Sequence, residues 1–367
     1  MTIEDLALYF TKGLGSRGAA HLVDHFGSAE RIYEASRSEL INGAGLRVEI
    51  ADRILAHEGM REAEQEIKYC QKHDIRIIAA TDDDYPEALR ATADRPHILF
   101  IMGNVEALRK QCLAMVGTRE ISPSGIHSAN ILIKDLGDQV ADLCIVSGLA
   151  YGADSACHRA ALANGITTVA IIPSNLPSIT PAAHAQLASE IIKAGGAIVS
   201  ELSSQTRNNG SHFISRNRII AGMSLATLVV ESPAEGGSLK TADIADSYSR
   251  TVLALPGRIT DTNSFGTNNL IRSGKARLVL TADDIIEDAG LQRSTKGQIT
   301  TTDNKEEVAL TESERKIIDA FKQSSILDWS ELLASTGLSM GELAMVMMDL
   351  EFKGAIRTLP GKRYEVI

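Results

Sequence analysis

A stretch without carboxylates carries the side chains in this sequence that are best suited to bind an anion. Residues 202–230 contain no Asp or Glu, although the formal net charge of the 367-residue chain is −10. Phe213, Arg216 and Arg218 lie close together in this stretch, within SHFISRNRII. An aromatic ring can stack on a nucleobase, and guanidinium groups bind phosphate oxygens. We therefore expect a phosphate-bearing ligand here, with Asn217 bonding a base edge or capping the next helix.

A structural interpretation of the same residues stays open. Phe213 could belong to the hydrophobic core, and Arg216 and Arg218 could pair with Glu201 and Glu231. Residues two positions apart on a helix do not share a face. If a helix begins by Asn217, one arginine would therefore bind the ligand while the other braces the fold.

Glycine-rich loops between apolar runs and helical patterns provide further anion sites. Gly117 begins GTRE, Gly148 lies in SGLAYGADSACH, and Gly237 lies in EGGSLKT. A loop of N–H groups that leads into a helix binds anions, because these groups lack backbone partners and the helix dipole favours negative charge. No loop fits G-x-G-x-x-G or G-x-x-x-x-G-K-[ST], so dinucleotide and P-loop chemistry is not expected.

The residues that most often carry catalysis do not form a set in this sequence. His158 and Asp154 are four positions apart on one predicted helix, where we expect His158 to pack rather than react. Ser147 and Ser238 follow apolar runs, but neither lies in G-x-S-x-G. The His and Cys spacings fit no metal site, and the four cysteines are expected to be reduced, buried thiols. We therefore predict no catalytic residue, no cofactor and no metal.

Short apolar runs that alternate with helical patterns must position these loops. Apolar runs without polar alternation are typical of strands buried on both faces, and helices between them imply right-handed crossovers. We expect strands at 75–80, 98–102, 113–116, 144–147, 167–172, 197–200, 227–230, 252–254 and 278–280. The fold class is therefore α/β, with an extended Rossmann-like, mostly parallel, doubly wound core. The sequence does not decide the strand order.

The first 69 residues carry helical patterns around two similar glycine turns. GLGSRG begins at Gly13, and GAGLRV begins at Gly43. These turns are similar to the helix-hairpin-helix turn, whose N–H groups can hold a DNA phosphate. Packing of helices across turns that need positive φ explains them equally well. We predict an all-α domain of the SAM or helix-hairpin-helix type at residues 1–69, followed by the core at 70–289.

The end of the chain has the pattern of a linker and a winged helix. Residues 290–306 are polar and aperiodic, which is typical of a linker. Three capped helices and two strand-like runs then predict a winged helix at 307–367. The capping residues are Thr311 with Glu314, Asp328, and Ser339 with Glu342. The third helix carries methionines and acidic residues, which argues against a DNA-reading helix.

The loops and the Arg-Asn-Arg segment together resemble the DNA-processing protein A family (DprA, also called Smf). The shared motifs are VGTRE, SGLAYGADSACHRAAL, SEL, HFISRNRIIAG, VVES, GGSLKTADIA, LPGR and GTNNLI, in the family's order. They span residues 114–271, and the flanking segments resemble the longer members of the family. The sequence departs from the family's usual pattern directly after Phe213. The family usually has a proline at that position, and this chain has Ile214.

The resemblance implies a single-stranded DNA-binding protein of natural transformation that protects incoming DNA and helps to load the RecA recombinase. It also implies a homodimer formed through the Rossmann-like core, without catalytic turnover. The residues that would bind DNA are Arg119, Phe213, Arg216, Asn217, Arg218, Gly117, Gly148, Gly237 and Lys240.

An enzymatic function stays open as an alternative. EGGSLKT is superficially similar to the P-G-G-x-G-T loop of phosphoribohydrolase-like, nucleotide-binding Rossmann enzymes, but it departs at Glu235 and Leu239. The N-terminal residues lack a signal-peptide pattern, and no apolar run is long enough to cross a membrane. We therefore expect a cytoplasmic protein without membrane contact.

Overall fold

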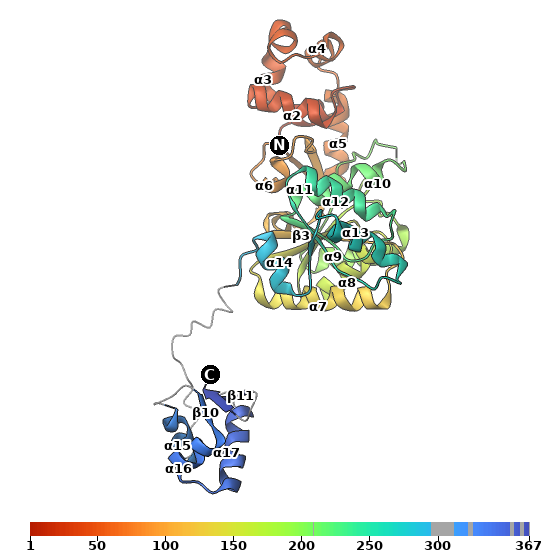
Figure 1. The fold of residues 1–367 in the computed structure, drawn as a ribbon. Helices are drawn as coiled ribbons and strands as arrows, with labels where there is room; N and C mark the ends of the chain where they lie inside the picture. The colour runs from red at the N-terminus through yellow and green to blue at the C-terminus, as the bar shows by residue number, and fades with distance from the viewer. Residues whose placement is uncertain (208, 295–311, 322–325, 353–355, 360–362, 367) are drawn as a thin grey trace. The chain divides into compact units, whose positions relative to one another are not determined.

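The computed structural model describes residues 1–207, 209–294, 312–321, 326–352, 356–359 and 363–366. They belong to two compact units, Met1–Gly297 and Gln298–Ile367. The nine core strands predicted from the apolar runs are all present, and they form one sheet in the first unit (Figure 1). None of the helices in the described ranges is long and apolar enough to cross a membrane.

The core sheet is mostly parallel, as predicted. Its strands are β1 (Arg76–Ala79), β2 (Ile98–Gly103), β3 (Gln111–Val116), β4 (Leu143–Ser147), β5 (Thr167–Ile171), β6 (Ala197–Ser200), β7 (Ala226–Val229), β8 (Thr251–Ala254) and β9 (Arg277–Leu278). They are ordered β1-β2-β6-β5-β4-β3-β7-β8-β9. The pairs β1–β2 and β2–β6 are antiparallel, and the pairs from β6 to β9 are parallel. The antiparallel strands extend the doubly wound part at one edge.

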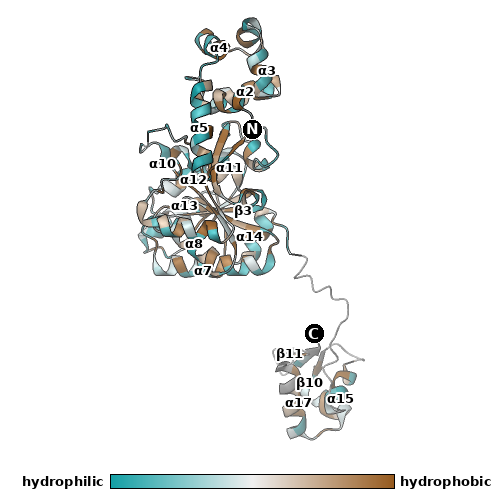
Figure 2. Cartoon of the chain, turned by 180° about the vertical axis from the view of Figure 1, so that it is seen from behind, coloured by the Kyte–Doolittle hydropathy of each residue, from teal (hydrophilic) through white to brown (hydrophobic). Residues whose placement is uncertain are grey.

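Helices cover both faces of this sheet, which explains why the strand sequences do not alternate. One face packs on α7 (Pro123–Gln139), α8 (Ala153–Ala163) and α14 (Ala282–Ala289). The other face packs on α11 (Asn217–Met223), α12 (Gly237–Ser247) and α13 (Phe265–Arg272). Along β3, Leu113 and Met115 face the first layer, whereas Ala114 and Val116 face the second. Figure 2 shows hydrophobic strands between helices whose outer sides are more hydrophilic.

The N-terminal segment is helical, as predicted. It contains α1 (Ile3–Phe10), α2 (Gly15–Phe26), α3 (Ala29–Glu34), the π-helical turn η1 (Glu39–Gly43), α4 (Val48–Leu55) and α5 (Met60–Lys72). Gly13, Gly15 and Gly45 have positive φ, so both glycine turns need the freedom of glycine. The turns are tied together, because Arg47 donates to the carbonyl of Gly13 at 3.2 Å.

The predicted boundary at residue 69 falls within α5. This helix and α1 share a hydrophobic cluster with β2, β6 and α9 (Ala185–Lys193), so the helical segment is packed on the core. Glu66 of α5 accepts hydrogen bonds from the backbone and the hydroxyl of Ser204, at 2.7 and 2.6 Å. The helical segment therefore belongs to the same compact unit as the sheet.

The chain remains on the core beyond α14. Leu291 is buried, the carbonyl of Gln292 accepts from Ala141, and Ser294 donates to the carbonyl of Gln139 at 2.7 Å. The first residues of the predicted linker are therefore part of the first unit. Residues 295–306 lie outside the described residues.

The described residues of the second unit form three helices and a small sheet. The helices are α15 (Glu312–Ala320), α16 (Trp329–Thr336) and α17 (Met340–Phe352), and β10 (Ile326–Asp328), β11 (Ile356–Leu359) and β12 (Arg363–Val366) pair in the order β10-β12-β11. Asp328 forms a capping box with Glu331, and Ser339 bonds reciprocally with Glu342. Both predicted caps are confirmed, whereas Thr311 lies outside the described residues. The strand β10 was missed, because its three residues directly precede a helix.

His158 packs inside the core rather than lining the surface. Its Nδ1 lies 2.7 Å from Thr168 Oγ1, and that hydroxyl donates to the carbonyl of Ile145, so Nδ1 must donate to Thr168. Burial, with smaller effects of Arg216 and His184, lowers the pKa of His158 to about 3. The ring is therefore neutral in the folded protein at neutral pH.

This burial predicts a specific loss of stability in acid. Below the unfolded pKa of about 6.5, the unfolded chain binds a proton that the folded chain does not, so stability falls as pH decreases towards 3. Between about pH 7 and about pH 4.5, wild type should lose roughly 2 to 3 kcal/mol more than His158→Gln. Urea unfolding followed by far-UV circular dichroism measures this difference. The only tryptophan, Trp329, reports separately on the second unit.

His127→Gln is the matched control, because His127 is an exposed histidine of the neighbouring helix α7. It should lose as much stability in acid as wild type. Equal pH dependence of wild type and His158→Gln would show that His158 is not a buried neutral group.

Candidate functional site

The sheet has a switch point between β3 and β7. From β3 the chain builds outward through β4, β5 and β6 on one side, and through β7, β8 and β9 on the other. The loops that follow β3 and β7 therefore leave the sheet in opposite directions and open a crevice at the carboxyl ends of the strands. Open α/β sheets bind ligands at this position.

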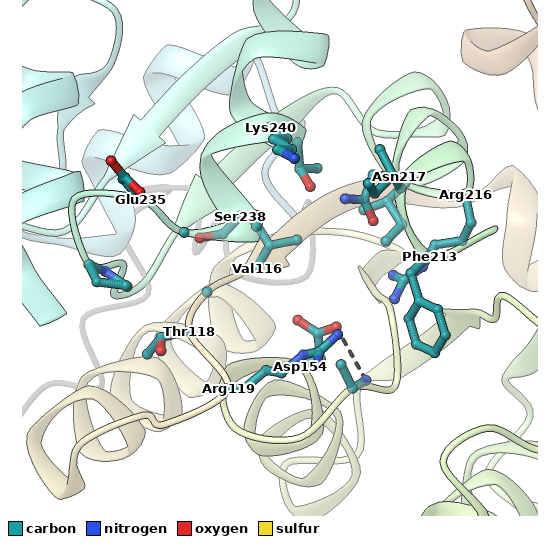
Figure 3. Close-up of a pocket in the computed structure, with 18 residues that line it drawn as sticks. Val116, Thr118, Arg119, Asp154, Phe213, Arg216, Asn217, Glu235, Ser238 and Lys240 are labelled. Atoms are coloured by element: carbon teal, nitrogen blue, oxygen red, sulfur yellow. Dashed lines mark hydrogen bonds between the residues drawn. The ribbon is translucent and has the colours of Figure 1, made fainter. Parts of the chain in front are cut away.

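A cavity of about 390 Å³ occupies the switch point (Figure 3). It is lined by residues 116–119 after β3, by Ala150 and Asp154 after β4, by residues 233–241 after β7, and by the segment from Phe213 to Ile220. These are the three glycine loops and the Arg-Asn-Arg segment singled out in the sequence. The fold thus brings together elements that are more than a hundred residues apart in the chain.

Backbone hydrogen bonds hold the three loops together. Thr118 donates to the carbonyl of Glu231 at 2.8 Å, and its own carbonyl accepts from Ala153 at 3.0 Å. A Cβ at Gly117 would lie 2.6 Å from the Cβ of Ala153, so this close approach requires glycine. Ser122 caps α7, and its backbone N–H donates to the carboxylate of Glu231 at 2.8 Å. Glu231 is therefore engaged by the backbone and hydroxyl of Ser122 rather than by an arginine.

Arg216 is the most unusual residue of the cavity. Its side chain is 5% exposed, and its Nε is buried without a hydrogen-bond partner. Within the described residues it forms no ion pair shorter than 4 Å. Its guanidinium lies against Gly148, where a Cβ would be 1.6 Å from Nη1. A buried cation is costly unless a negative group lies close to it, and Asp154 offsets this cost only in part, so the arrangement favours an anion supplied by a ligand.

Asp154 is the acidic group whose charge acts on this guanidinium, and the sequence analysis did not assign it to the site. It lines the cavity from the first turn of α8 and accepts a hydrogen bond from Ala150 at 3.3 Å. Burial raises the pKa of Asp154, while the charge of Arg216 opposes this rise. Burial likewise lowers the pKa of Arg216, which Asp154 partly offsets. One signal in the sequence could have assigned Asp154 to the site, namely its position in the first turn of a helix that follows a glycine loop.

Arg119 and Phe213 meet at the mouth of the cavity. The guanidinium carbon of Arg119 lies 5.8 Å from the centre of the Phe213 ring, a cation–π distance. Arg119 is exposed and Phe213 is half-buried, outside the hydrophobic clusters of the described core. Phe213 is therefore not a core residue, which favours the ligand-binding interpretation over the structural one. Figure 3 shows both side chains at the rim of the cavity, with Lys240 opposite Arg119.

The first turn of α12 completes the cavity. Gly237 begins this helix, and its N-cap, Gly236, has no side chain to bond the N–H groups of that turn. A Cβ at Gly237 would meet no atom within 4 Å, so the space in front of the turn is open. The exposed Lys240 lies one turn further along and also lines the cavity. The helix dipole and the lysine charge both favour a negative group here.

Arg218 does not line the cavity, although the sequence placed it in the same binding set. The helix α11 begins at Asn217, so Arg218 points away from Arg216. Arg218 pairs with the half-buried carboxylate of Glu201 and lies 3.5 Å from Ser16 of the helical segment. Burial raises the pKa of Glu201, and the charge of Arg218 opposes this rise. Arg218 therefore joins α11 to the core and to α2, as the structural interpretation had proposed.

Reactive residues elsewhere in the core are occupied in packing. His184 Nδ1 bonds the carbonyl of Leu149 at 2.7 Å, and Ser147 donates to the carbonyl of Met115 at 2.6 Å. All four cysteines are free and buried. Across the described ranges, no three His, Cys, Asp or Glu side chains are arranged to hold a metal ion.

Comparisons with known proteins agree with this architecture. Residues 76–290 match the family model described as DNA recombination-mediator protein A, and residues 302–362 match the DprA winged helix domain. Protein Smf of Escherichia coli is 36% identical over 248 residues, which cover 68% of this chain and 65% of that protein. The match therefore spans just under two thirds of that relative. The DNA processing protein DprA of Streptococcus pneumoniae is 38% identical over 205 residues, covering 56% of this chain and 71% of that protein.

Two solved structures share the fold. The X-ray structure of DprA from Streptococcus pneumoniae aligns with a TM-score of 0.67 at 30% identity, covering 78% of this chain and 98% of that one. A structure of DNA processing protein A from Helicobacter pylori aligns with a TM-score of 0.52 at 25% identity, covering 58% and 94%. That structure describes the single-stranded DNA binding mode of the Helicobacter pylori protein.

The different surroundings of the two arginines predict opposite effects on stability. Arg218→Met leaves the carboxylate of Glu201 buried without its partner, so the free energy of unfolding should fall by about 3 kcal/mol or more. Arg216→Met removes a buried charge without an ion-pair partner, and Asp154 can take up a proton in response. The free energy of unfolding should therefore change by less than about 1 kcal/mol.

Urea unfolding of the two variants at neutral pH checks this contrast. Methionine preserves most of the side-chain length in both, so each variant is the control for the other. A large destabilisation by Arg216→Met would mean that Arg216 has a structural partner rather than an open site.

Proposed function

This chain belongs to the DNA recombination-mediator protein A family, and from that membership we propose that it binds single-stranded DNA in the cavity between β3 and β7. We also propose that it protects incoming single strands during natural transformation and passes them to the RecA recombinase in the cytoplasm. The family match over residues 76–290 and the Helicobacter pylori relative support the DNA ligand. The observation that carries the site is the buried guanidinium of Arg216, which lines the cavity without an ion-pair partner within 4 Å among the described residues.

The geometry suits one nucleotide of an unpaired strand. Phe213 offers a ring on which a base stacks. The phosphate of that nucleotide is then within reach of Arg119, whose guanidinium carbon lies 5.8 Å from the ring centre. The adjoining phosphate binds Arg216 and the first turn of α12. Bases of a duplex are stacked on one another and cannot enter such a cavity, so the site selects single strands. Stacking and phosphate binding are tolerant of sequence, as a mediator of recombination requires.

Binding without turnover is the more economical proposal. The described residues of the cavity contain a buried carboxylate, Asp154, but no serine, cysteine or histidine paired with a base. The enzymatic alternative, a nucleotide-hydrolysing Rossmann protein, is not favoured by the family match. Release of a free base from AMP by the purified protein would restore that alternative.

The core also offers a surface for the proposed homodimer. β9 is the last strand of the sheet, and Leu278 and Leu280 beside it are 43% and 69% exposed. Edge strands and exposed apolar side chains favour association with a second chain. A dimer would place two cavities on one length of single-stranded DNA.

Substitution of the two rim residues tests the DNA site. Phe213→Ala should weaken binding of an oligothymidine by ~1–3 kcal/mol, through the loss of one stacked base. Arg119→Ala should lower the slope of log K against log salt by about 0.7, through the loss of one phosphate contact. Gel shifts with single-stranded and duplex DNA at about 50 mM and about 200 mM salt measure both quantities.

Two controls give this test its specificity. Tyr151 is an aromatic residue that is 52% exposed and packs on His184 outside the cavity, so Tyr151→Ala should bind like wild type. Lys134 is exposed on α7, and Lys134→Ala should leave the salt slope unchanged. Wild-type affinity and slope in both rim variants would place the DNA elsewhere on the protein.

Two glycine substitutions separate the role of Arg216 from that of the loops. Gly148→Ala puts a methyl group 1.6 Å from Nη1 of Arg216 and must displace the guanidinium, so affinity for oligothymidine should fall by about tenfold or more. Gly210→Ala also adds a methyl group in open space, but Gly210 does not line the cavity, so the affinity should change by less than about threefold. Equal effects of the two substitutions would show that Arg216 does not hold the DNA.

A further inference from the structure

A second large cavity lies at the opposite edge of the core sheet from the DNA site. Its volume is about 710 Å³. It is lined by residues 83–91, by residues 108–112, where the chain enters β3, and by residues that directly precede β7 and β8. The cavity therefore lies at the amino ends of the parallel strands, whereas the DNA site lies at their carboxyl ends. All its lining residues belong to the first unit.

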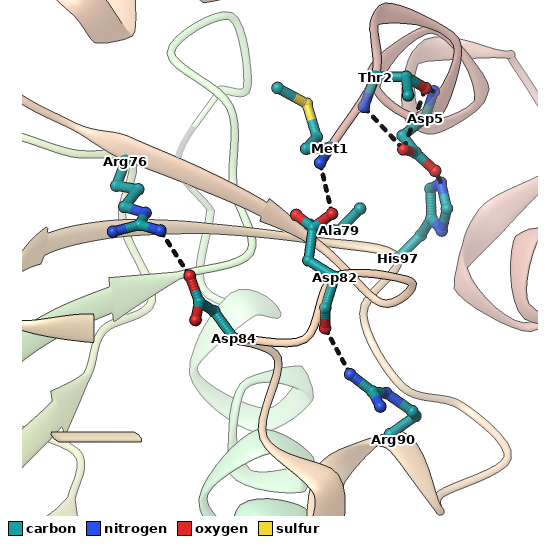
Figure 4. Close-up of polar contacts among 9 residues, drawn as sticks. All are labelled: Met1, Thr2, Asp5, Arg76, Ala79, Asp82, Asp84, Arg90 and His97. Atoms are coloured by element: carbon teal, nitrogen blue, oxygen red, sulfur yellow. Dashed lines mark hydrogen bonds and ion pairs between the residues drawn. The ribbon is translucent and has the colours of Figure 1, made fainter. Parts of the chain in front are cut away.

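Three cations at this cavity are bound to neutral oxygens only. Arg90 donates to the backbone carbonyl of Asp82 (Figure 4), and Arg250 donates to the carbonyl of Ala88 at 2.9 Å. Lys110 donates to the hydroxyl of Thr167 at 2.9 Å. Among the described residues, none of the three lies within 4 Å of a carboxylate, and the Nε atoms of Arg90 and Arg250 are buried without a partner. Their charges are therefore not compensated by the protein.

The lining itself carries four cations and two carboxylates. Arg109 is a fourth cation of the lining, and it lies 3.9 Å from Asp84 and 3.7 Å from Glu106. The two acidic residues of the lining, Asp83 and Glu87, are exposed. The cavity is therefore positive, although the formal net charge of the whole chain is −10. It favours a ligand with carboxylates.

The floor of the cavity is apolar. Leu108, Cys112 and Met223 are each at most 3% exposed and belong to the core cluster beneath the sheet's second face. Leu225 and Pro86 extend this floor. A ligand that fills the cavity must therefore offer apolar side chains between its negative groups.

We propose that this cavity docks an acidic, partly apolar peptide segment of a partner protein. Carboxylates of the segment would pair with Arg90, Lys110 and Arg250, and its apolar side chains would cover the floor. A nucleic acid fits less well, because Tyr85 is the aromatic residue of the lining and is 2% exposed, which leaves no face for stacking. Because the two cavities lie at opposite edges of the sheet, the protein can hold DNA and this partner at the same time.

Fluorescence polarisation with defined peptides tests the proposal on the full chain. The probe is a fluorescein-labelled octapeptide of alternating aspartate and leucine. It should bind in the micromolar range, and at least about tenfold more tightly than octapeptides of alternating aspartate and serine or alternating lysine and leucine. These comparison peptides remove the apolar groups or reverse the charge.

Two substitutions locate the binding. Lys110→Glu reverses one charge, and Arg250→Gln removes another while keeping a donor for Ala88, so each should weaken the probe by about tenfold or more. Lys134→Glu, an exposed charge reversal on α7, should leave the affinity within about twofold. Far-UV circular dichroism confirms that each variant is folded, independently of DNA binding.

Three results would overturn the proposal. The first is that the acidic probe fails to bind at concentrations below about 1 mM. The second is that wild type and both cavity variants bind the probe equally well. The third is that oligothymidine displaces the probe competitively. The last result would assign the cavity to nucleic acid. Persistence of probe binding in Phe213→Ala separates this proposal from the DNA site, because it does not depend on that site.

Discussion

The burial of one guanidinium whose charge the protein offsets only in part is the constraint on which the rest of the site depends. Arg216 lies under the cavity against Gly148, with its charge facing the space between β3 and β7. A side chain at position 148 would displace it, and a carboxylate in contact with it would neutralise it. The loops after β3, β4 and β7 are tied to one another by backbone hydrogen bonds, so the cavity keeps its shape without the ligand. The protein thus carries the cost of a buried charge in the free state, and an anion relieves it on binding.

The contrast between Arg216 and Arg218 shows how one short segment serves both fold and function. The two residues flank Asn217, where α11 begins, and therefore point in different directions. Arg218 pairs with Glu201 and approaches Ser16, so it joins the helical segment to the core. Arg216 has no such partner. The difference is set by what each direction offers: an interior carboxylate on one side and an open cavity on the other.

The same physical rule connects the two edges of the sheet. At the carboxyl ends, uncapped N–H groups and a cation without an ion-pair partner among the described residues form the proposed DNA site. At the amino ends, cations that bond only carbonyl and hydroxyl oxygens create a second positive cavity over an apolar floor. In both places, the proposed ligand is negatively charged because the fold buries positive charges that it does not fully neutralise. The lining differs, since an accessible aromatic ring is present at the first cavity, and the aromatic ring at the second is buried.

The sequence by itself determined the α/β class, the nine core strands and the caps of α16 and α17, and most of the binding residues that it proposed line the cavity. The period of the hydrophobic pattern, the capping residues and the glycine loops are local signals that can be read from the sequence. The order of the motifs identified the family resemblance. Only the tertiary structure decided that β1 and β2 run antiparallel, that Asp154 joins the cavity, and that Arg218 leaves it. Strand direction and side-chain partners depend on contacts between residues far apart in the chain, such as Arg216 with Gly148 and Arg218 with Glu201. Composition cannot distinguish an arginine that faces a buried carboxylate from one that faces open space, because that difference exists only once the chain has folded.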